Sequence, residues 1–211
     1  MIKQMTIEEY LSDPCSASSL PLWKTETINV PDSLLIIRDD AFIADQFTEY
    51  NDAPYFKVIH RLSGISEQHL NGKFQLVSAS VEDYAQHIHT CYGWEITAMD
   101  LKAYMSHPVY HPDLWLAVKD METGQIIASG IAELDARIGE GILEWIQVSP
   151  NYRRMGFGKY IVQELLWRMK DRASFVTVSG ELNNKSNPLA LYLRCGFTHT
   201  VIWHILSRRS H

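Results

Sequence analysis

Cysteine is scarce in this chain: its 211 residues include only three cysteines, and these lie far apart. They are Cys15, Cys91 and Cys195, and no two of them form a Cys-x-x-Cys pair. A disulfide framework is therefore excluded as the basis of the fold. We expect Cys195, which stands beside a Gly-Phe turn, to be a small buried residue.

Long apolar runs are absent as well. No segment approaches the roughly 20 apolar residues that a membrane-spanning helix needs. The segment from Met1 to Thr6 lacks the apolar core of a signal peptide. The composition, with 46% hydrophobic and 21% charged residues, is typical of a soluble globular protein. We therefore expect a cytoplasmic protein with no membrane partner.

Positive charge is in deficit. The chain has 19 lysines and arginines against 25 aspartates and glutamates, which gives a net charge of −6. Binding to nucleic acid depends on clustered lysine and arginine, so we expect no nucleic-acid partner. An acidic surface is compatible with a cationic amine substrate, which it would attract by electrostatic steering.

The histidines do not form a metal-binding pattern. His87 and His89 fall in a predicted helix, where residues two apart point in different directions, so we expect both to be exposed to solvent. His107 and His111 fall in a predicted loop and have no acidic or cysteine companion at the spacing of metal ligands. We predict no metal site.

One segment stands out between a predicted strand and a predicted helix: Arg153-Arg154-Met155-Gly156-Phe157-Gly158. The apolar run before it, 142–148, predicts a buried strand, and apolar residues at helical spacing predict an amphipathic helix over 158–171. A strand that turns through two glycines into a helix directs backbone N–H groups and the positive end of the helix dipole at one point. The two arginines and Lys159 add side-chain cations. The segment therefore predicts an anion-binding site.

Two common nucleotide-binding patterns are missing from this segment. There is no Gly-x-Gly-x-x-Gly followed by an acidic residue about twenty positions on, which excludes the dinucleotide-binding fingerprint. There is no Gly-Lys-Ser/Thr, which excludes a nucleoside triphosphate P-loop. The pattern that fits is Arg/Gln-x-x-Gly-x-Gly/Ala.

A second motif follows about 35 residues later, runs from Asn187 to Phe197 and contains Leu-Tyr-x-x-x-Gly-Phe. Together, and in this order, the two motifs resemble the GCN5-related N-acetyltransferase (GNAT) family over roughly residues 74–211. The resemblance implies an acetyl-CoA-dependent N-acetyltransferase. Such an enzyme moves the acetyl group from the CoA thioester to a primary amine by direct attack.

The resemblance also implies how acetyl-CoA binds as the cosubstrate. The strand backbone pairs with the pantetheine amides like an added strand, and the main chain of the glycine loop holds the pyrophosphate. A backbone N–H near Val148 stabilises negative charge that develops on the thioester oxygen. The residues that we expect to bind the cosubstrate are Ile146, Gln147, Val148, Arg153, Arg154, Met155, Gly156, Phe157, Gly158, Lys159 and Asn187.

The sequence departs from the family at one position. Lys185 stands where family members often have an asparagine, about seven residues before Tyr192. Asn187 is followed by Pro188, a pair that also predicts the N-cap and first residue of a helix. A contact with the cosubstrate and a capping role both stay open for Asn187.

Tyr192 matches the position of a tyrosine acid that protonates the leaving sulfur in many family members. The usual pKa of tyrosine is about 10 and that of a thiol about 8.5, so a phenol is a competent donor. The alternative is that the ring of Tyr192 packs against the sheet and its hydroxyl is merely hydrogen-bonded. We favour the acid.

Glu144 is the provisional general base for the amine. It lies in a mainly apolar strand, and burial raises the pKa of a carboxyl group toward neutrality. Its parity in the strand predicts that it faces away from Trp145. A salt-bridged or edge-exposed glutamate is the equal alternative, and many family members use only a water chain. The rival carboxylates are Glu133, Asp135 and Glu140.

The order of predicted elements indicates an α/β fold, with a mixed central sheet flanked by helices. From residue 74 the order is strand, two helices, three strands, helix, strand, helix, strand, as in the GNAT family. The ranges are 74–79, 81–91, 96–106, 114–118, 126–134, 142–148, 158–171, 175–179, 188–195 and 197–206. We expect residues 74–211 to form the acetyltransferase domain, on which residues 1–73 pack as an ordered α/β extension.

Four prolines interrupt the extension, in which we predict strands over 33–38 and 55–59 and a short helix over 41–50. Outside the motifs, several points stay open. The acceptor is a small-molecule amine or a protein amine, because acceptor pockets are built from variable loops. The oligomeric state is undecided, with a homodimer among the options. The alternative function is a non-catalytic acyl-CoA-binding regulatory or interaction module with the same fold.

Overall fold

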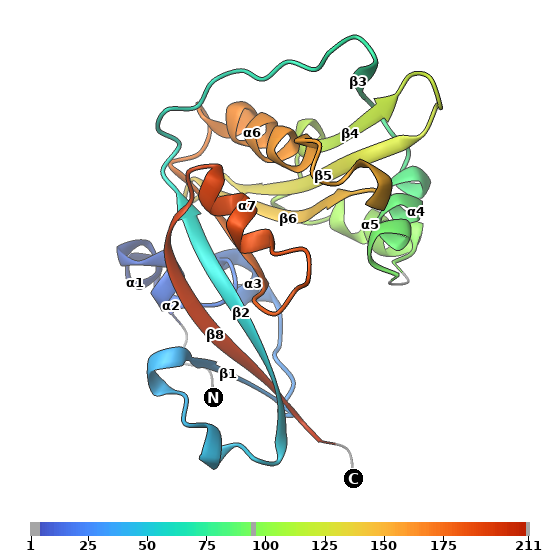
Figure 1. Ribbon diagram of the computed structural model, residues 1–211. Helices are drawn as coiled ribbons and strands as arrows, with labels where there is room; N and C mark the ends of the chain where they lie inside the picture. The colour runs from blue at the N-terminus through green and yellow to red at the C-terminus, as the bar shows by residue number, and fades with distance from the viewer. Residues whose placement is uncertain (1–4, 94–95, 210–211) are drawn as a thin grey trace. The chain divides into compact units, whose positions relative to one another are not determined.

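The computed structural model describes residues 5–93 and 96–209, which group into two compact units. Unit 1 consists of Met1–His60 and Thr177–His211, and unit 2 of Arg61–Val176. This grouping by contacts does not test the predicted division at residue 73, which stays a prediction. Both units combine helices with strands (Figure 1), so the predicted α/β fold is confirmed.

Within unit 2, the described residues form an antiparallel sheet of four strands together with three α-helices. The strands lie in the order β6-β5-β4-β3. In chain order the elements are β3 (Phe74–Val77), α4 (Val81–Tyr92), α5 (Ala98–Tyr104), β4 (Trp115–Asp120), β5 (Ile126–Asp135), β6 (Glu140–Val148) and α6 (Phe157–Met169). Their ends differ from the predicted ends by at most two residues.

Capping explains where the helices beside the sheet begin. Ser80 and Asp83 form a capping box at the start of α4, and Thr97 and Asp100 form another at the start of α5. Gly93 ends α4 in a left-handed conformation, with φ of 71°. No helix in the described parts of the chain is long and apolar enough to cross a membrane.

The helices α4 and α6 pack on opposite faces of the unit 2 sheet. Neighbouring residues of a strand point to opposite faces, and on β5 the side chain of Ser129 bonds His87 of α4. A Cβ atom at the next residue, Gly130, would lie 2.4 Å from Cγ2 of Ile161 in α6. Ile161 is fully buried and has little room to move. Glycine at position 130 therefore lets α6 pack closely on β5.

In unit 1 the strands lie in the order β1-β8-β2-β7. The long strands β2 and β8 run antiparallel side by side, and β1 pairs with the other edge of β8 (Figure 1). The elements are α1 (Ile7–Ser12), α2 (Pro14–Ala17), α3 (Leu22–Thr27), β1 (Leu34–Arg38), β2 (Tyr50–His60), β7 (Phe175–Glu181), α7 (Pro188–Arg194) and β8 (Thr198–Arg208). The first two residues of β7 group with unit 2.

The N-terminal segment is more helical than predicted. Pro14 is the first residue of α2 and Pro21 caps α3, so these prolines begin helices instead of interrupting them. The two predicted strands are confirmed as β1 and β2. The predicted helix over 41–50 is wrong: the chain makes two short 3-10 turns there, Asp39–Ala41 and Ala44–Gln46. Pairing of β2 with β8 begins at Tyr50, the last residue of the predicted helix.

A histidine between two aspartates ties unit 1 together. His204 of β8 places Nδ1 2.9 Å from Asp52 Oδ2 and Nε2 3.0 Å from Asp39 Oδ1. Its ring stacks on Phe42, with the ring centroids 3.8 Å apart. Burial disfavours the charged imidazolium, but the hydrogen bonds to the aspartates and their negative charges outweigh it, so the pKa of His204 is raised.

We expect the raised pKa of His204 to make the protein less stable at alkaline pH. The protonated ring contributes in full below the unfolded-state pKa of 6.5, and this contribution is lost as the pH rises through the higher folded-state pKa. Over that window the free energy of unfolding should fall by at most about 1.4 kcal/mol per pH unit.

Urea unfolding of the wild type and of His204→Gln at several pH values measures this slope. His204→Gln should remove it, whereas the control His69→Gln, which changes an exposed histidine, should retain it. An unchanged slope in His204→Gln would contradict the assignment.

Candidate functional site

A β-bulge interrupts β6 in its middle. Leu143 and Trp145 pair with consecutive residues of β5, so Glu144 between them is an extra residue without a partner position in the ladder. An extra residue breaks the regular alternation of side chains along a strand. The prediction that Glu144 faces away from Trp145 relied on that alternation, and the bulge removes its basis.

Beyond the bulge, β6 directs the backbone groups of Ile146 and Val148 away from β5. The amide of Ser149 donates to the carbonyl of Ile127, which makes these two residues a hydrogen-bonded pair. In an antiparallel ladder such pairs alternate with pairs whose N–H and C=O groups point outward, and Ile146 and Val148 occupy those positions. The backbone of Gln147, by contrast, faces β5.

Side chains meet both outward carbonyls. The hydroxyl of Tyr92 donates to the carbonyl of Ile146 at 2.8 Å, and Nε of Arg153 donates to the carbonyl of Val148 at 3.2 Å. Arg153 also donates through Nη2 to the carbonyl of Cys91, at 3.2 Å. Both carbonyls thus accept hydrogen bonds from polar side chains.

The start of α6 has no side-chain cap. Gly156 is the N-cap residue, with φ of 95°, and the first main-chain bond of the helix runs from the amide of Tyr160 to the carbonyl of Gly156. The amides of Phe157, Gly158 and Lys159 precede that bond and point out of the helix. A Cβ atom at Gly156 would meet nothing within 4 Å, so the space beside this helix end is open. Such an end suits an anion.

Three exposed cations lie within three residues of Gly156 along the chain. The side chains of Arg153, Arg154 and Lys159 are exposed. Within the described parts of the chain, neither Arg154 nor Lys159 forms an ion pair. Phe157, in contrast to these exposed cations, is buried, and its ring centroid lies 4.7 Å from that of Phe74 in β3. This contact holds the first turn of α6 in place.

The candidate bases differ in their surroundings. Glu144 is half-buried at the bulge. The three rival carboxylates are all buried: Glu133, Asp135 and Glu140. Asp135 bonds Arg137 at 2.8 Å, and Glu133 bonds Nδ1 of His107 at 3.1 Å. Asp135 and Glu133 thus bond neighbouring side chains, and the assignment of Glu144 as the base stays a prediction.

Two predicted site residues belong to unit 1. Tyr192 of α7 is buried, and its ring centroid lies 6.0 Å from that of Phe56 and 5.5 Å from that of Phe197. Asn187 caps α7, since its Oδ1 accepts a hydrogen bond from the amide of Ala190 at 3.2 Å. Ring packing of Tyr192 and capping by Asn187 are thus observed. The roles of these residues toward the cosubstrate stay predictions.

His87 is a site residue that the sequence reasoning missed. It was expected to be exposed, which is wrong: only 5% of the residue is exposed. Its Nδ1 lies 2.7 Å from Ser129 Oγ and its Nε2 lies 3.0 Å from Ser149 Oγ. Burial lowers the pKa of His87 to about 4, so the ring is neutral at pH 7. His89 is exposed, as predicted.

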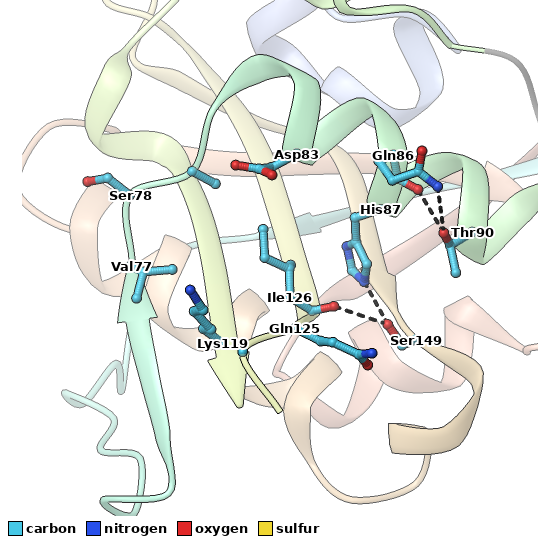
Figure 2. A pocket seen from close by; sticks show the side chains of 12 residues that line it. Val77, Ser78, Asp83, Gln86, His87, Thr90, Lys119, Gln125, Ile126 and Ser149 are labelled. Atoms are coloured by element: carbon cyan, nitrogen blue, oxygen red, sulfur yellow. Dashed lines mark hydrogen bonds between the residues drawn. The ribbon is translucent and has the colours of Figure 1, made fainter. Parts of the chain in front are cut away.

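A cavity of about 480 Å³ opens beside this histidine (Figure 2). Its wall includes Asp83 and His87 of α4, Lys119 of β4, and Ser149. Figure 2 shows the ring of His87 directed at the hydroxyl of Ser149. The pair of His87 and Ser149 can therefore be reached from the cavity.

A cysteine nucleophile is not supported. Sγ of Cys91 lies 3.5 Å from Nε2 of His87, which in outline is a nucleophile next to a base. Burial raises the pKa of Cys91 to about 11, so almost no thiolate exists at pH 7. Among the described residues, no group of three or more histidine, cysteine or acidic side chains is arranged to hold a metal ion.

The residues present fit acetyl-CoA. The uncapped amides of α6 and the exposed cations suit a diphosphate. The outward N–H and C=O groups of Ile146 and Val148 suit an arm that contains amides. Both features belong to unit 2 and follow each other directly along the chain.

Comparison with known proteins gives a family match over part of the chain. The family model for the acetyltransferase (GNAT) domain matches residues 111–199. This stretch contains both sequence motifs and the elements from β4 to α7. No curated protein sequence matches the chain.

Solved structures with this fold are distant in sequence. The chain is similar to a GCN5-related N-acetyltransferase from Sphaerobacter thermophilus, with a TM-score of 0.64 and 15% identity, over 97% of this chain and 66% of that one. It thus spans just under two thirds of that protein. It is also similar to the ribosomal-protein-S18-alanine N-acetyltransferase from Escherichia coli, with a TM-score of 0.50 and 16% identity, over 65% of this chain and 96% of that one.

A third similar structure is Ard1 from Thermoplasma volcanium, with a TM-score of 0.52 and 14% identity, over 66% of this chain and 99% of that one. At such identities the structures show a shared fold, and the family model adds the domain assignment. Residues 111–199 thus match the GNAT acetyltransferase domain, and the resemblance to the GCN5-related N-acetyltransferases that the two motifs predicted is confirmed.

Proposed function

We propose that the protein is an acetyl-CoA-dependent N-acetyltransferase that moves an acetyl group from the CoA thioester to a primary amine. The proposal rests mainly on two structural features of unit 2 that follow each other directly along the chain. An edge of β6 with outward backbone groups leads directly into a glycine loop whose helix amides are uncapped. A long ligand with an amide arm and a diphosphate matches both features at once.

The reaction is a direct transfer. The amine nitrogen attacks the thioester carbonyl carbon, the C–N bond forms and the C–S bond breaks. A backbone N–H near Val148 stabilises the negative charge on the carbonyl oxygen during this step. A cationic amine first releases one proton and so becomes a neutral nucleophile. The nitrogen loses a second proton during the transfer, and the leaving thiolate gains one.

Each proton has a proposed partner. Tyr192 gives the proton to the thiolate, a role supported by its place in the Leu-Tyr-x-x-x-Gly-Phe motif. Glu144, at the bulge of β6, removes the proton from the amine directly or through water. The acidic net charge of −6 favours the approach of a cationic amine.

Calorimetry with CoA and thiol release from acetyl-CoA test the proposal together. We expect heat of binding, and a stabilisation of about 2.7 kcal/mol at a CoA concentration of roughly 100 times Kd. We also expect thiol release that depends on an added amine from a panel of small amines and peptides with free N-termini.

The two readouts separate the candidate functions. Binding of CoA without thiol release across the panel would favour a non-catalytic acyl-CoA-binding module. No heat at millimolar CoA would refute both functions. Release with peptides alone would identify a protein amine as the acceptor, and release with small amines alone would identify a small molecule.

A further inference from the structure

The hydrogen bonds around His87 form a chain with one direction. Nε2 of Gln147 can only donate, so Oγ of Ser129 accepts from it. Oγ of Ser129 could also accept a second bond, but its residue is fully buried, and among the described residues its own hydroxyl proton has no acceptor other than Nδ1 of His87. Ser129 therefore donates to Nδ1, which is the acceptor nitrogen. Nε2 of His87 therefore carries the proton and donates it to Oγ of Ser149.

The chain ends on the backbone. Ser149 donates its hydroxyl proton to the carbonyl of Ile126, 3.4 Å away. Ser129 thus accepts one bond and donates one, and the histidine does the same with its two nitrogens. Sγ of Cys91, 3.5 Å from Nε2, is a further neighbour at this end of the chain of hydrogen bonds. Only a neutral ring fits this arrangement, which agrees with the low pKa of the buried His87.

Ser149, the last residue of this chain of hydrogen bonds, lies between β6 and the glycine loop. Ser149 follows Val148, the last residue of β6, and precedes the 3-10 turn Pro150–Tyr152 that leads into the glycine loop. Its amide is bound to β5 and its side chain to α4. Ser149 is therefore the point at which the path of the chain from strand to loop is fixed.

Further contacts of α4 support the same function. Tyr92 donates to the carbonyl of Ile146, and Arg153 of the glycine loop donates to the carbonyl of Cys91. With His87, the second half of α4 thus contacts the strand edge, the strand end and the loop. Each of these is part of the proposed cosubstrate site.

We propose that His87 is a positioning residue for coenzyme A binding, which as the neutral Nε2–H tautomer fixes Ser149 and so the angle between the edge of β6 and the glycine loop. This inference rests on the proposed function. It assigns His87 no contact with the reacting atoms. Its loss should weaken cosubstrate binding much more than it slows the chemical step.

Two variants of His87 test the role of the Nε2–H group. His87→Leu removes both nitrogens and should raise Kd for CoA and KM for acetyl-CoA about tenfold, with kcat changed by less than about threefold. His87→Gln can place a side-chain N–H near the position of Nε2 and should recover most of the affinity. The matched control is His89→Gln, two residues along the same helix and exposed, which should bind CoA like the wild type.

A third variant covers the case in which His87→Leu does not fold. Ser149→Ala removes only a half-buried hydroxyl and should raise Kd for CoA by a similar factor. Because both changes break one chain of hydrogen bonds, Ser149→Ala combined with His87→Leu should cost no more CoA affinity than either change alone. Additive losses would overturn the inference.

Nitrogen NMR measures the charge and the tautomer of the His87 ring. A merely structural role would require neither a particular charge nor a particular tautomer. At pH 7 the spectrum should show a neutral His87 with its proton on Nε2. A charged ring, or the Nδ1–H tautomer, would overturn the inference.

If the wild type binds CoA and His87→Leu and Ser149→Ala bind it equally well, only the positioning role falls. If the wild type does not bind CoA, the proposed function falls and takes this inference with it.

Discussion

Replacing Tyr192 with phenylalanine should lower kcat by roughly 10²- to 10⁴-fold, the usual contribution of a general acid, and leave Kd for CoA within about twofold. The hydroxyl is expected to act only when the thiolate leaves, so its loss affects the transition state and not binding of the cosubstrate. Kd by calorimetry and kcat by thiol release give the two numbers on the same preparation.

Phenylalanine is the appropriate substitution because the ring of Tyr192 packs against Phe56 and Phe197. These contacts remain in Tyr192→Phe, so the midpoint of thermal unfolding should stay close to that of the wild type. Tyr55→Phe is the control, since Tyr55 is a half-buried tyrosine of the same unit. An equal loss of kcat in both variants, or an equal loss of kcat and CoA affinity in Tyr192→Phe, would argue against the acid role.

Replacing Gly156 with valine should raise Kd for CoA by roughly 10- to 100-fold. With φ of 95°, Gly156 has a backbone conformation that a β-branched residue does not readily adopt. The chain around a valine must therefore turn, which displaces the first amides of α6. Losing one or two hydrogen bonds to a charged phosphate, at about 1.5 kcal/mol each, accounts for a change of this size.

A second glycine separates backbone strain from loss of the ligand site. Gly124 lies in the turn between β4 and β5, with φ of 72°, and a Cβ atom there also meets nothing within 4 Å. Gly124→Val should cost a similar amount of stability, about 1–2 kcal/mol, without changing Kd for CoA. If Gly156→Val binds CoA like the wild type while it is destabilised as Gly124→Val is, the glycine loop does not hold the diphosphate.

The central part of unit 2 could be predicted from the sequence because its signals are local. The apolar run of β6, the two glycines and the helical spacing of α6 lie within about 30 consecutive residues. The serine and threonine caps of α4 and α5 act over three residues. Local signals of this kind do not depend on which segments meet in space.

The burial of His87 depends on partners that are distant along the chain. Ser129 and Ser149 lie 42 and 62 residues away. A signal was nevertheless present: His87 is three residues after Tyr84 and four before Cys91, which places it on the inner face of α4. The spacing of two residues between His87 and His89 carries no information about this face.

The bulge at Glu144 and the pairing in unit 1 have a similar cause. A bulge is a mismatch between two strands, and the sequence of β6 alone does not contain it. The pairing of β8 with β1 and β2 joins segments separated by more than a hundred residues. No periodicity within either segment predicts such a partner.

The position of β8 between β1 and β2 has a consequence for biosynthesis. Ribosomes make β1 and β2 first, and β8 starts at Thr198, well over a hundred residues after β2 ends at His60. At a translation rate of about 5–20 residues per second, roughly 7–28 s pass between the synthesis of β2 and the start of β8. Throughout this time their unpaired edges are open to chaperones and to neighbouring nascent chains. The sheet of unit 1 is therefore completed only when translation has delivered β8.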